Sequence, residues 1–297
     1  MRKNNSDVKN NKKKIIIVIA IVVILVILLV FLGRTKKVKS NVYDNITDNT
    51  SDVKEEVNQD VTQSKLVPKD VDAIVPIFMY HFVLDDYGDN LDSENFIKPS
   101  TLEEQLKYIS DNGYQTIFAD ELDNLYKYEK PVCLTFDDVF VYFYNNAYPL
   151  FKKYNQKATL FIITNYINGE NYLTEDQIKE MADSGLISIE SHTLSHEDLS
   201  KMTYEEQEKQ AYESKERLEK LTGKQVTTYC YPYGRYNNDT IQIAKKQYEL
   251  GLRMDGGIYD TTVSKDVFQI PRIYANRSMS IDTFASYLKK SSVKVKE

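Results

Sequence analysis

Six apolar runs of strand length constrain the fold of this chain more than any other feature of its sequence. Stretches with the spacing of amphipathic helices separate them. The runs span residues 74–81, 131–138, 158–163, 186–192, 226–234 and 268–274. Strands that alternate with helices predict a largely parallel sheet covered by helices. We therefore expect an α/β fold. Polar residues gather at the carboxyl ends of several runs, where a β/α barrel places its chemistry.

Capping residues mark the boundaries of the intervening helices. A Ser or Thr stands three residues before a Glu or Gln at three places, which is the spacing of a capping box. These residues predict helix starts at Ser100, Thr174 and Thr203. Glycine commonly ends a helix, because it adopts the left-handed conformation at low cost. Helix ends are therefore expected at Gly113, Gly185 and Gly223.

Residues 15–32 read IIIVIAIVVILVILLVFL, an uninterrupted run of eighteen apolar residues. At ~1.5 Å per residue a helix of this length reaches about 27 Å, close to the hydrocarbon thickness of a bilayer. Six cations precede the run, four follow it closely, and no small-residue cleavage site is present. The cation excess predicts a single transmembrane signal anchor with the N-terminus inside. A cleaved signal peptide is the alternative.

The anchor divides the chain into segments. Residues 1–14 would form a basic cytoplasmic tail. Residues 33–70 are rich in Asn, Asp, Lys, Thr and Ser, a composition typical of a disordered linker, here extracellular. A folded domain is expected over residues 71–290, followed by a C-terminal tail at 291–297. This order places the domain outside the cell and attached to the membrane.

The charge balance excludes nucleic acid as a partner. Residues 1–40 carry ten Lys or Arg and one Asp, whereas the remainder carries 28 Lys or Arg and 43 Asp or Glu. An acidic body lacks the clustered cations that phosphate contacts need. The chain has no Trp but 23 Tyr and 12 Phe, so stacking on a ligand ring would come from Tyr or Phe.

The two cysteines, Cys133 and Cys230, lie inside apolar runs and outside any CxxC pair. This placement predicts buried free thiols, with a disulfide as the alternative.

Three polar clusters at the ends of predicted strands carry the candidate chemistry. His192 and His196 stand four residues apart in SHTLSH, so both imidazoles can reach a single ion. Asp137 and Asp138 follow the mainly apolar VCLTF. Adjacent strand residues point in opposite directions, so one carboxylate can face a metal while the other faces a water. Two His and one carboxylate leave an open coordination position, the pattern of a catalytic zinc.

The third cluster is the turn Tyr231-Pro232-Tyr233-Gly234. A turn held by proline can direct a backbone N–H at a developing oxyanion. An ordinary turn without a chemical role is the alternative.

LTFDD, SHTLSH and YPYG, in this order, resemble the three main motifs of the polysaccharide deacetylases, carbohydrate esterase family four. The resemblance covers roughly residues 74–288 and includes NAYPLFKKYNQKATLFII. It implies a distorted (β/α) barrel of about seven strands. It also implies metal-dependent removal of acetyl groups from N-acetylglucosamine units of an extracellular polysaccharide. Zinc is the expected metal, and cobalt or nickel suits the same ligands.

The resemblance also implies a role for each motif residue. Asp138, His192 and His196 would hold the metal. Asp137 would be the general base that deprotonates the water at the metal. The backbone N–H of Tyr233 would help the metal to stabilise the tetrahedral oxyanion.

The sequence departs from the family pattern at three points. Val139 stands where a glycine usually follows the two Asp, and a β-branched residue resists unusual backbone angles. Cys230 stands where many members carry an arginine that pairs with the base. Arg272 is the candidate substitute, with a surface ion pair as the alternative. No His follows His196, so the general acid that many members take from a late Leu-x-His motif must come from elsewhere. We predict His81 as this acid, with a structural histidine as the alternative.

Two substrates stay open. The MYH segment and Arg272-Ile273 resemble the branch of the family that acts on poly-β-1,6-N-acetylglucosamine, whereas the predicted anchor favours the glycan of peptidoglycan. Acetylxylan-type esterase activity is a further alternative. A catalytically weak cell-wall polysaccharide-binding module is another, because Val139 and the missing arginine leave room for it.

Overall fold

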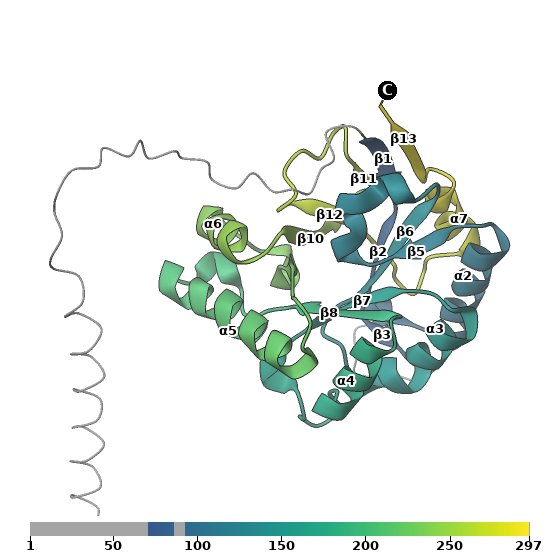
Figure 1. Cartoon of the computed structure of the whole chain (residues 1–297). Helices are drawn as coiled ribbons and strands as arrows, with labels where there is room; N and C mark the ends of the chain where they lie inside the picture. Colours follow the sequence, from purple (N-terminus) through teal and green to yellow (C-terminus); the bar gives the residue numbers. More distant parts are fainter. Residues whose placement is uncertain (1–70, 86–92, 297) are drawn as a thin grey trace, which may run out of the picture. The chain divides into compact units, whose positions relative to one another are not determined.

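A computed structural model of the protein describes residues 71–85 and 93–296. The expected membrane anchor at residues 15–32 and the linker at residues 33–70 lie outside these residues. Among the helices of the described part, none is both long and apolar enough to cross a bilayer. The described residues form an α/β domain in which helices surround a core of strands (Figure 1).

Parallel strands close into a barrel at the centre of the domain. The ring runs in the order β2-β12-β10-β9-β8-β7-β6, and β6 pairs back to β2. All the pairings of the ring are parallel. The strands are β2 Ile77–Tyr80, β6 Pro131–Phe136, β7 Ala158–Ile162, β8 Ile187–Ser191, β9 Thr228–Cys230, β10 Leu250–Gly256 and β12 Ile270–Tyr274. A further strand, β5 (Gln115–Ile117), adds to β6 alone. The predicted (β/α) barrel of about seven strands is confirmed.

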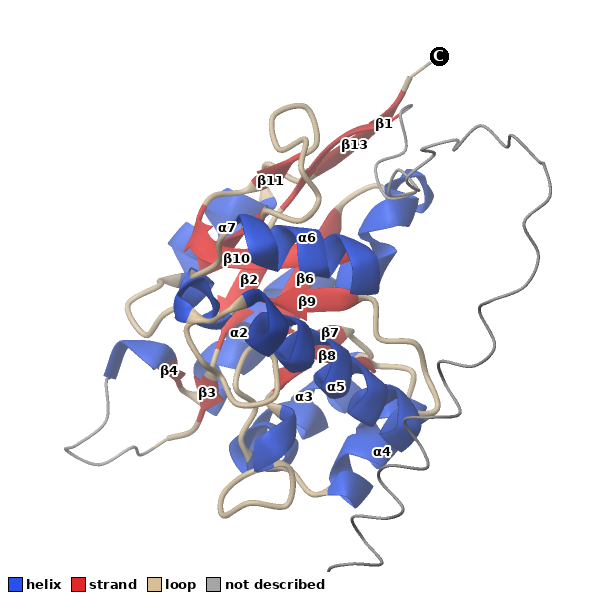
Figure 2. Ribbon diagram, turned by 90° about the vertical axis from the view of Figure 1, so that its left-hand side faces the viewer, coloured by secondary structure: helices blue, strands red, loops and turns tan. Residues whose placement is uncertain are grey.

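Helices cover the outside of this barrel (Figures 1 and 2). They are α2 Pro99–Asp111, α3 Tyr148–Tyr154, α4 Glu175–Asp183, α5 Tyr204–Thr222, α6 Asn238–Gln247 and α7 Ile281–Leu288. Short helical segments lie between them at η1 Ser93–Asn95, η2 Ala119–Lys127, η3 Phe143–Ala147, η4 Thr164–Tyr166, η5 Leu199–Lys201 and η6 Pro232–Gly234.

Two of the three predicted capping boxes are confirmed. Thr174 and Thr203 each accept a hydrogen bond from the backbone N–H three residues on, and the side chain there returns one. The prediction at Ser100 is wrong, because α2 already begins at Pro99, with Lys98 at the N-cap. The fixed φ of proline suits the first helical position and starts the helix without a side-chain cap.

The predicted helix ends at glycine are also confirmed. Gly223 is the left-handed C-cap of α5, with a φ of 68°. Gly113 and Gly185 adopt φ of 68° and 74° directly after the C-caps of α2 and α4.

The run at residues 74–81 forms two strands instead of one. β1 (Val71–Val75) ends before Pro76 and β2 begins after it. Proline has no N–H to donate to a strand ladder, so the chain changes sheet there. β1 pairs with β11 (Tyr259–Asp260) and β13 (Ser292–Val295) in an antiparallel sheet at one end of the domain (Figure 2). β13 therefore ties part of the expected C-terminal tail to the domain. A small parallel pair, β3 (Phe82–Val83) with β4 (Phe96–Ile97), completes the strands.

The contact between β8 and β9 is sparse and is reinforced by a side chain. Only Ser191 and Tyr229 pair directly across it. The carboxyl group of Glu190, which is buried, accepts hydrogen bonds from the backbone N–H groups of Thr227 (2.9 Å) and Thr228 (2.7 Å). Burial and the nearby charge of Asp120 raise the pKa of Glu190 well above its usual range. Glu190 thus closes the barrel where ladder bonds are few.

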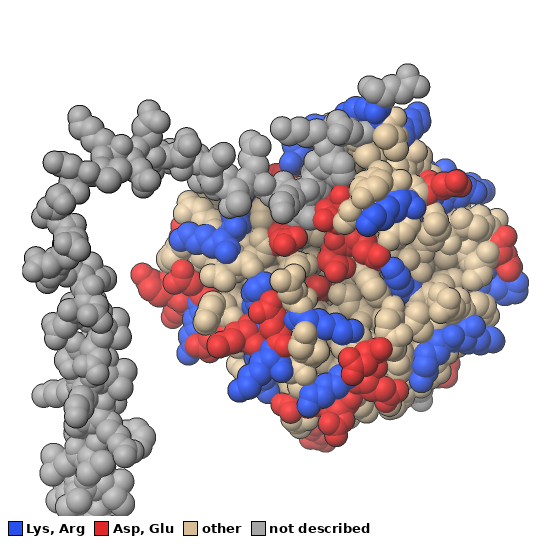
Figure 3. Space-filling model, in the orientation of Figure 1, with Lys and Arg blue, Asp and Glu red and all other residues tan. Residues whose placement is uncertain are grey.

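The two cysteines are buried and free, as predicted. Cys230 ends β9, and Cys133 lies within β6. On the face shown in Figure 3, Lys and Arg side chains are interspersed with Asp and Glu, with no continuous basic area.

Candidate active site and metal centre

Three side chains meet at the carboxyl ends of β6 and β8. Asp138 follows β6, while His192 and His196 follow β8. The Oδ1 atom of Asp138 lies 3.4 Å from Nε2 of His192 and 3.1 Å from Nε2 of His196. Ligands bound at roughly 2.0–2.2 Å to one tetrahedral ion are separated by about 3.3 Å, so these spacings fit a shared cation.

We call Asp138, His192 and His196 the triad. Hydrogen bonding in and around the triad leaves its ligand atoms facing one another. The Nδ1 of His192 lies 2.9 Å from the carbonyl oxygen of Cys230, which orients the ring and leaves Nε2 facing Asp138. The Oδ1 of Asp138 is buried and has no hydrogen-bond partner among the described residues. A buried carboxylate oxygen without a donor is costly unless a cation neutralises it. The donor set therefore fits a divalent metal.

The loops that carry these ligands hold unusual backbone angles. Asp138, Thr193 and His196 have φ of 63°, 69° and 59°, in the left-handed region. Residues held there cost about 1–3 kcal/mol each and cluster at functional sites. Val139, which replaces the usual glycine, has a φ of 22° and donates its N–H to the carbonyl of Asp137 at 2.7 Å. Valine at position 139 therefore does not separate the metal ligands, but it leaves the loop strained.

Asp137 forms a buried, bidentate ion pair with Arg272. Both Nη–Oδ distances are 2.7 Å, and the guanidinium is fully buried. Arg272 was the predicted substitute for the missing arginine, and the structure places it against Asp137 as expected. The alternative, a surface ion pair, is wrong because β12 directs this side chain into the barrel.

The remaining donors of Arg272 are also engaged, which holds the pair in place. Nε donates to the carbonyl of Arg253 (3.0 Å), Nη1 to Oγ1 of Thr135 (3.0 Å) and Nη2 to the Sγ of Cys230 (3.1 Å). Arg272 is the largest fully buried side chain of the described residues. Sequence reasoning missed Thr135 and the carbonyl of Arg253, because neither carries a chemical motif.

The two carboxylates are ionised for different reasons. Burial raises the pKa of Asp137, but the charge and hydrogen bonds of Arg272 outweigh it and hold the pKa below its usual range. Burial likewise raises the pKa of Asp138, but the close imidazoles of His192 and His196 outweigh it and lower the pKa strongly. A general base and a metal ligand both require the ionised form.

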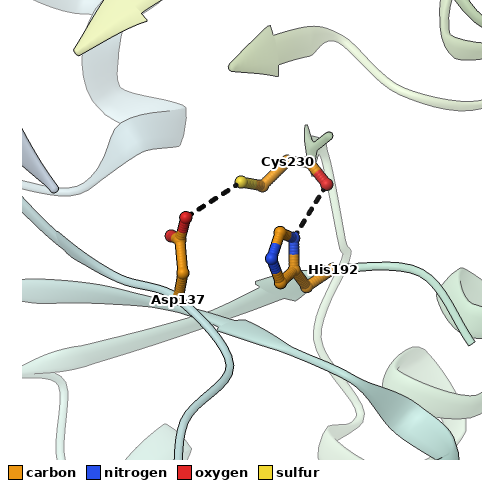
Figure 4. A group of neighbouring side chains, drawn as sticks. All are labelled: Asp137, His192 and Cys230. Atoms are coloured by element: carbon orange, nitrogen blue, oxygen red, sulfur yellow. Dashed lines mark hydrogen bonds between the residues drawn. The ribbon is translucent and has the colours of Figure 1, made fainter. Parts of the chain in front are cut away.

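A second group of side chains, Asp137, His192 and Cys230, also has ligand atoms within 4.8 Å of one another (Figure 4). Both oxygens of Asp137 already accept hydrogen bonds from Arg272, and the Cys230 thiol lies 3.5 Å from one of them. Burial raises the pKa of the Cys230 thiol, so it resists forming a thiolate ligand. We therefore assign the metal to Asp138, His192 and His196.

His81 lies directly after β2 and faces the same region. Its pKa is lowered by burial, while the charges of Asp137 and Asp138 raise it and those of Arg272 and His192 lower it. Its Nδ1 is buried without a hydrogen-bond partner among the described residues. The backbone therefore does not satisfy this atom, and the role of His81 as the general acid stays a prediction.

Tyr233 sits in the turn after β9, as predicted. Its φ of 58° reverses the backbone within η6. The residue is 56% exposed, and the centroid of its ring lies 4.4 Å from that of His196. The Tyr233 ring is thus next to the metal ligand His196.

A pocket of about 350 Å³ borders this turn. Its lining residues are Met79, Tyr233, Gly234, Met254, Asp255, Gly256 and Tyr274. Its volume falls within the roughly 300–1,000 Å³ of small-molecule sites. Sequence reasoning missed this pocket because it did not identify β10, which supplies Met254, Asp255 and Gly256.

Comparisons with known proteins agree with this geometry. The sequence profile of the family described as polysaccharide deacetylase matches residues 126–253. The protein YxkH of Bacillus subtilis (strain 168) is 34% identical over 233 residues, which cover 76% of this chain and 80% of YxkH. The chain belongs to the polysaccharide deacetylase family. It is a hydrolase of the polysaccharide N-deacetylase class.

Two further relatives of this deacetylase are informative. The poly-β-1,6-N-acetyl-D-glucosamine N-deacetylase of Staphylococcus aureus (strain MSSA476) is 30% identical over 215 residues, covering 65% of this chain and 71% of that protein. The deacetylase PplD of Streptococcus pyogenes, solved in complex with acetate, superposes with a TM-score of 0.67 at 31% identity. That superposition covers 72% of this chain and 98% of PplD.

Removing a ligand of the assigned triad should abolish tight metal binding. We expect Asp138→Asn and His196→Ala to weaken binding of Zn²⁺ by more than the roughly 10–100-fold that loss of an outer hydrogen-bonding partner costs. Titration calorimetry and elemental analysis of chelator-treated, reloaded protein measure this. Cys230→Ser is the matched control and should retain the metal. Loss of metal in Cys230→Ser together with retention in Asp138→Asn would move the site to the second group.

Replacing Arg272 should move the acid limb of the pH–rate profile upward. In the wild type the pKa of Asp137 lies below its usual range, so the base stays ionised as pH falls. In Arg272→Gln burial acts without its counter-charge, so Asp137 protonates, and activity is lost, at a higher pH. Arg272→Lys keeps the charge but not the bidentate contact and should shift less.

The profile of kcat/KM against pH tests this, with Arg217→Gln on α5 as the control. Breaking the pair should also destabilise the fold by about 3–5 kcal/mol, so unfolding is measured on each variant. An acid limb that stays in place in folded Arg272→Gln would mean that Asp137 is not the titrating base.

Proposed function

We propose that this deacetylase removes N-acetyl groups from poly-β-1,6-N-acetylglucosamine outside the cell, in a reaction that depends on a divalent metal. One observation carries the proposal: the ionised Asp137, held by Arg272, lies beside the triad of Asp138, His192 and His196 at the same end of the barrel. The relation to the S. aureus enzyme supports this polymer.

Each part of the chemistry has a residue in place. A divalent cation bound by the triad would polarise water and the acetyl carbonyl. Asp137 accepts the proton of the attacking water, because each of its oxygens keeps a lone pair beside its bond to Arg272. The backbone N–H of Tyr233 stabilises the negative charge that develops on the carbonyl oxygen.

His81 completes the set as the general acid. It donates a proton to the nitrogen of the departing sugar amine, which leaves as glucosamine while acetate is released. Burial lowers the pKa of His81, and the charges of Asp137 and Asp138 act in the opposite direction and favour the protonated ring that a general acid needs.

Zinc suits two imidazoles and one carboxylate, and cobalt or nickel binds the same donors. The apolar run at residues 15–32 supports attachment of the domain to the outer face of the membrane. A membrane-bound domain of this kind would modify a polymer as it reaches the cell surface.

Acetate release from purified polymers tests the proposal. Poly-β-1,6-N-acetylglucosamine should yield acetate at a higher kcat/KM than peptidoglycan glycan strands or acetylxylan, because the recognition of the sugar linkage follows the S. aureus relative. Asp137→Asn, which retains the metal ligands, is the control and should reduce release by roughly 10²–10⁴. Preferential release of acetate from peptidoglycan or acetylxylan would show that this polymer is the substrate instead of poly-β-1,6-N-acetylglucosamine. Polymer binding without release of acetate would favour a binding module.

Replacing His81 tests whether this residue is needed for catalysis but not for metal binding. We expect His81→Ala to lower kcat by roughly 10²–10⁴ while the bound metal stays unchanged, because His81 is not a ligand of the triad. Elemental analysis and steady-state kinetics on the same preparation provide both values. Unchanged turnover, or loss of the metal along with activity, would show that His81 is not the acid.

A further inference from the structure

Two tyrosines outside the catalytic set lie at the edge of the metal site. Tyr166 follows β7 and is 37% exposed, and Tyr172 lies in the same loop before α4. Their ring centroids are 4.8 Å apart. Phe140, two residues after Asp138, stacks on Tyr172 at 4.4 Å. We call Tyr166, Tyr172 and Phe140 the aromatic rim.

Backbone hydrogen bonds attach the rim to the loops that carry the metal ligands. On one side, the N–H groups of Thr164 and Asn165 donate to the carbonyls of Thr193 and Leu194, which lie between the two histidines (3.2 and 2.9 Å). On the other side, Phe140 and Tyr172 form a β-bridge next to the aspartate loop. The rim therefore has a defined position relative to the ligands.

The loop that presents Tyr166 and Tyr172 is built tightly. The N–H of Gly169 donates to the carbonyl of Tyr166 (2.8 Å), and a Cβ at Gly169 would lie 2.8 Å from that same oxygen. Asn168 and Asn171 adopt left-handed backbone angles, with φ of 65° each. A loop held in one conformation binds a ligand with less loss of entropy.

The charge state of the rim suits stacking. Burial, then the nearby Tyr166 and the charge of Asp138, raise the pKa of Tyr172 to about 12, so its ring is a neutral phenol at neutral pH. Burial, then the charge of Asp138, also raises the pKa of Tyr233. The rings of Tyr172 and Tyr233 therefore both lie near this metal ligand. Tyrosine combines a large apolar face with a polar edge, which matches the C–H faces and hydroxyl groups of a pyranose.

We propose that the aromatic rim is a binding subsite for a sugar ring next to the one that is deacetylated. This inference rests on the proposed function and adds that the enzyme recognises several linked hexosamine units. A ring stacked on Tyr166 would place the neighbouring N-acetyl group over the triad, with the linkage between the two rings setting the distance.

The experiment compares polymers with a substrate that cannot reach the rim. Metal-loaded enzyme is assayed on β-1,6-linked N-acetylglucosamine oligomers of two to six units and on 4-nitrophenyl acetate, a small ester without a sugar. Tyr166→Ala and Tyr172→Ala should each raise KM for the longer oligomers roughly tenfold, and the gain in kcat/KM with length should shrink. Hydrolysis of the ester should stay unchanged. Tyr166→Phe, which keeps the ring, should restore most of the oligomer activity.

Matched controls distinguish a failure of the rim proposal from a failure of the proposed function. Tyr126→Ala and Tyr212→Ala remove other exposed tyrosines (54% and 50% exposed) and should change neither substrate. A length dependence that persists in both rim variants, or an equal loss of ester hydrolysis, overturns the rim. A wild-type enzyme that cleaves the ester but releases no acetate from any oligomer overturns the proposed function, and the rim with it.

Discussion

The buried ion pair between Asp137 and Arg272 is the interaction on which the rest of the site depends. It joins the end of β6 to β12 through the interior of the barrel, with both Nη–Oδ distances at 2.7 Å. A charge buried in this way is stable only with its partner in place, so the two strands must meet in one register. The same contact keeps Asp137 ionised and directs its neighbour Asp138 to the opposite side, toward the histidines. One ion pair thus sets the base and the metal ligand together.

Cys230 connects this pair to the metal centre. Its thiol contacts Arg272, and its carbonyl oxygen orients His192. Cys230 stands at the end of β9, and Glu190 holds the start of β9 against β8 where direct ladder bonds are sparse. Although Cys230 replaces the usual arginine, Asp137 still pairs with a guanidinium. The guanidinium arrives from β12 instead, and the smaller thiol leaves it space.

The sequence predicted elements well where local chemistry decides them. Thr174 and Thr203 cap helices through bonds to their own first turns, which depend on four adjacent residues alone. It failed where a single run serves two sheets, because Pro76 interrupts the ladder within an apolar stretch. β10 was missed because LGLRMDG carries charges and glycines, and its strand character comes from pairing with β9 and β12.

The residues able to bind a metal and act as base could be named from the sequence alone, because the chain has three histidines and because Asp137 and Asp138 directly follow an apolar run of strand length. Their order in the chain also indicated the family and its barrel. Only the tertiary structure decided that Arg272 points inward to Asp137 instead of outward to solvent, since a side chain's partner depends on strands far apart in the chain. The pocket beside β10 and the aromatic rim likewise exist only after the barrel closes. The pocket is lined by residues of β2, η6, β10 and β12, and the rim by residues of two loops, so neither can be read from one continuous stretch of the sequence.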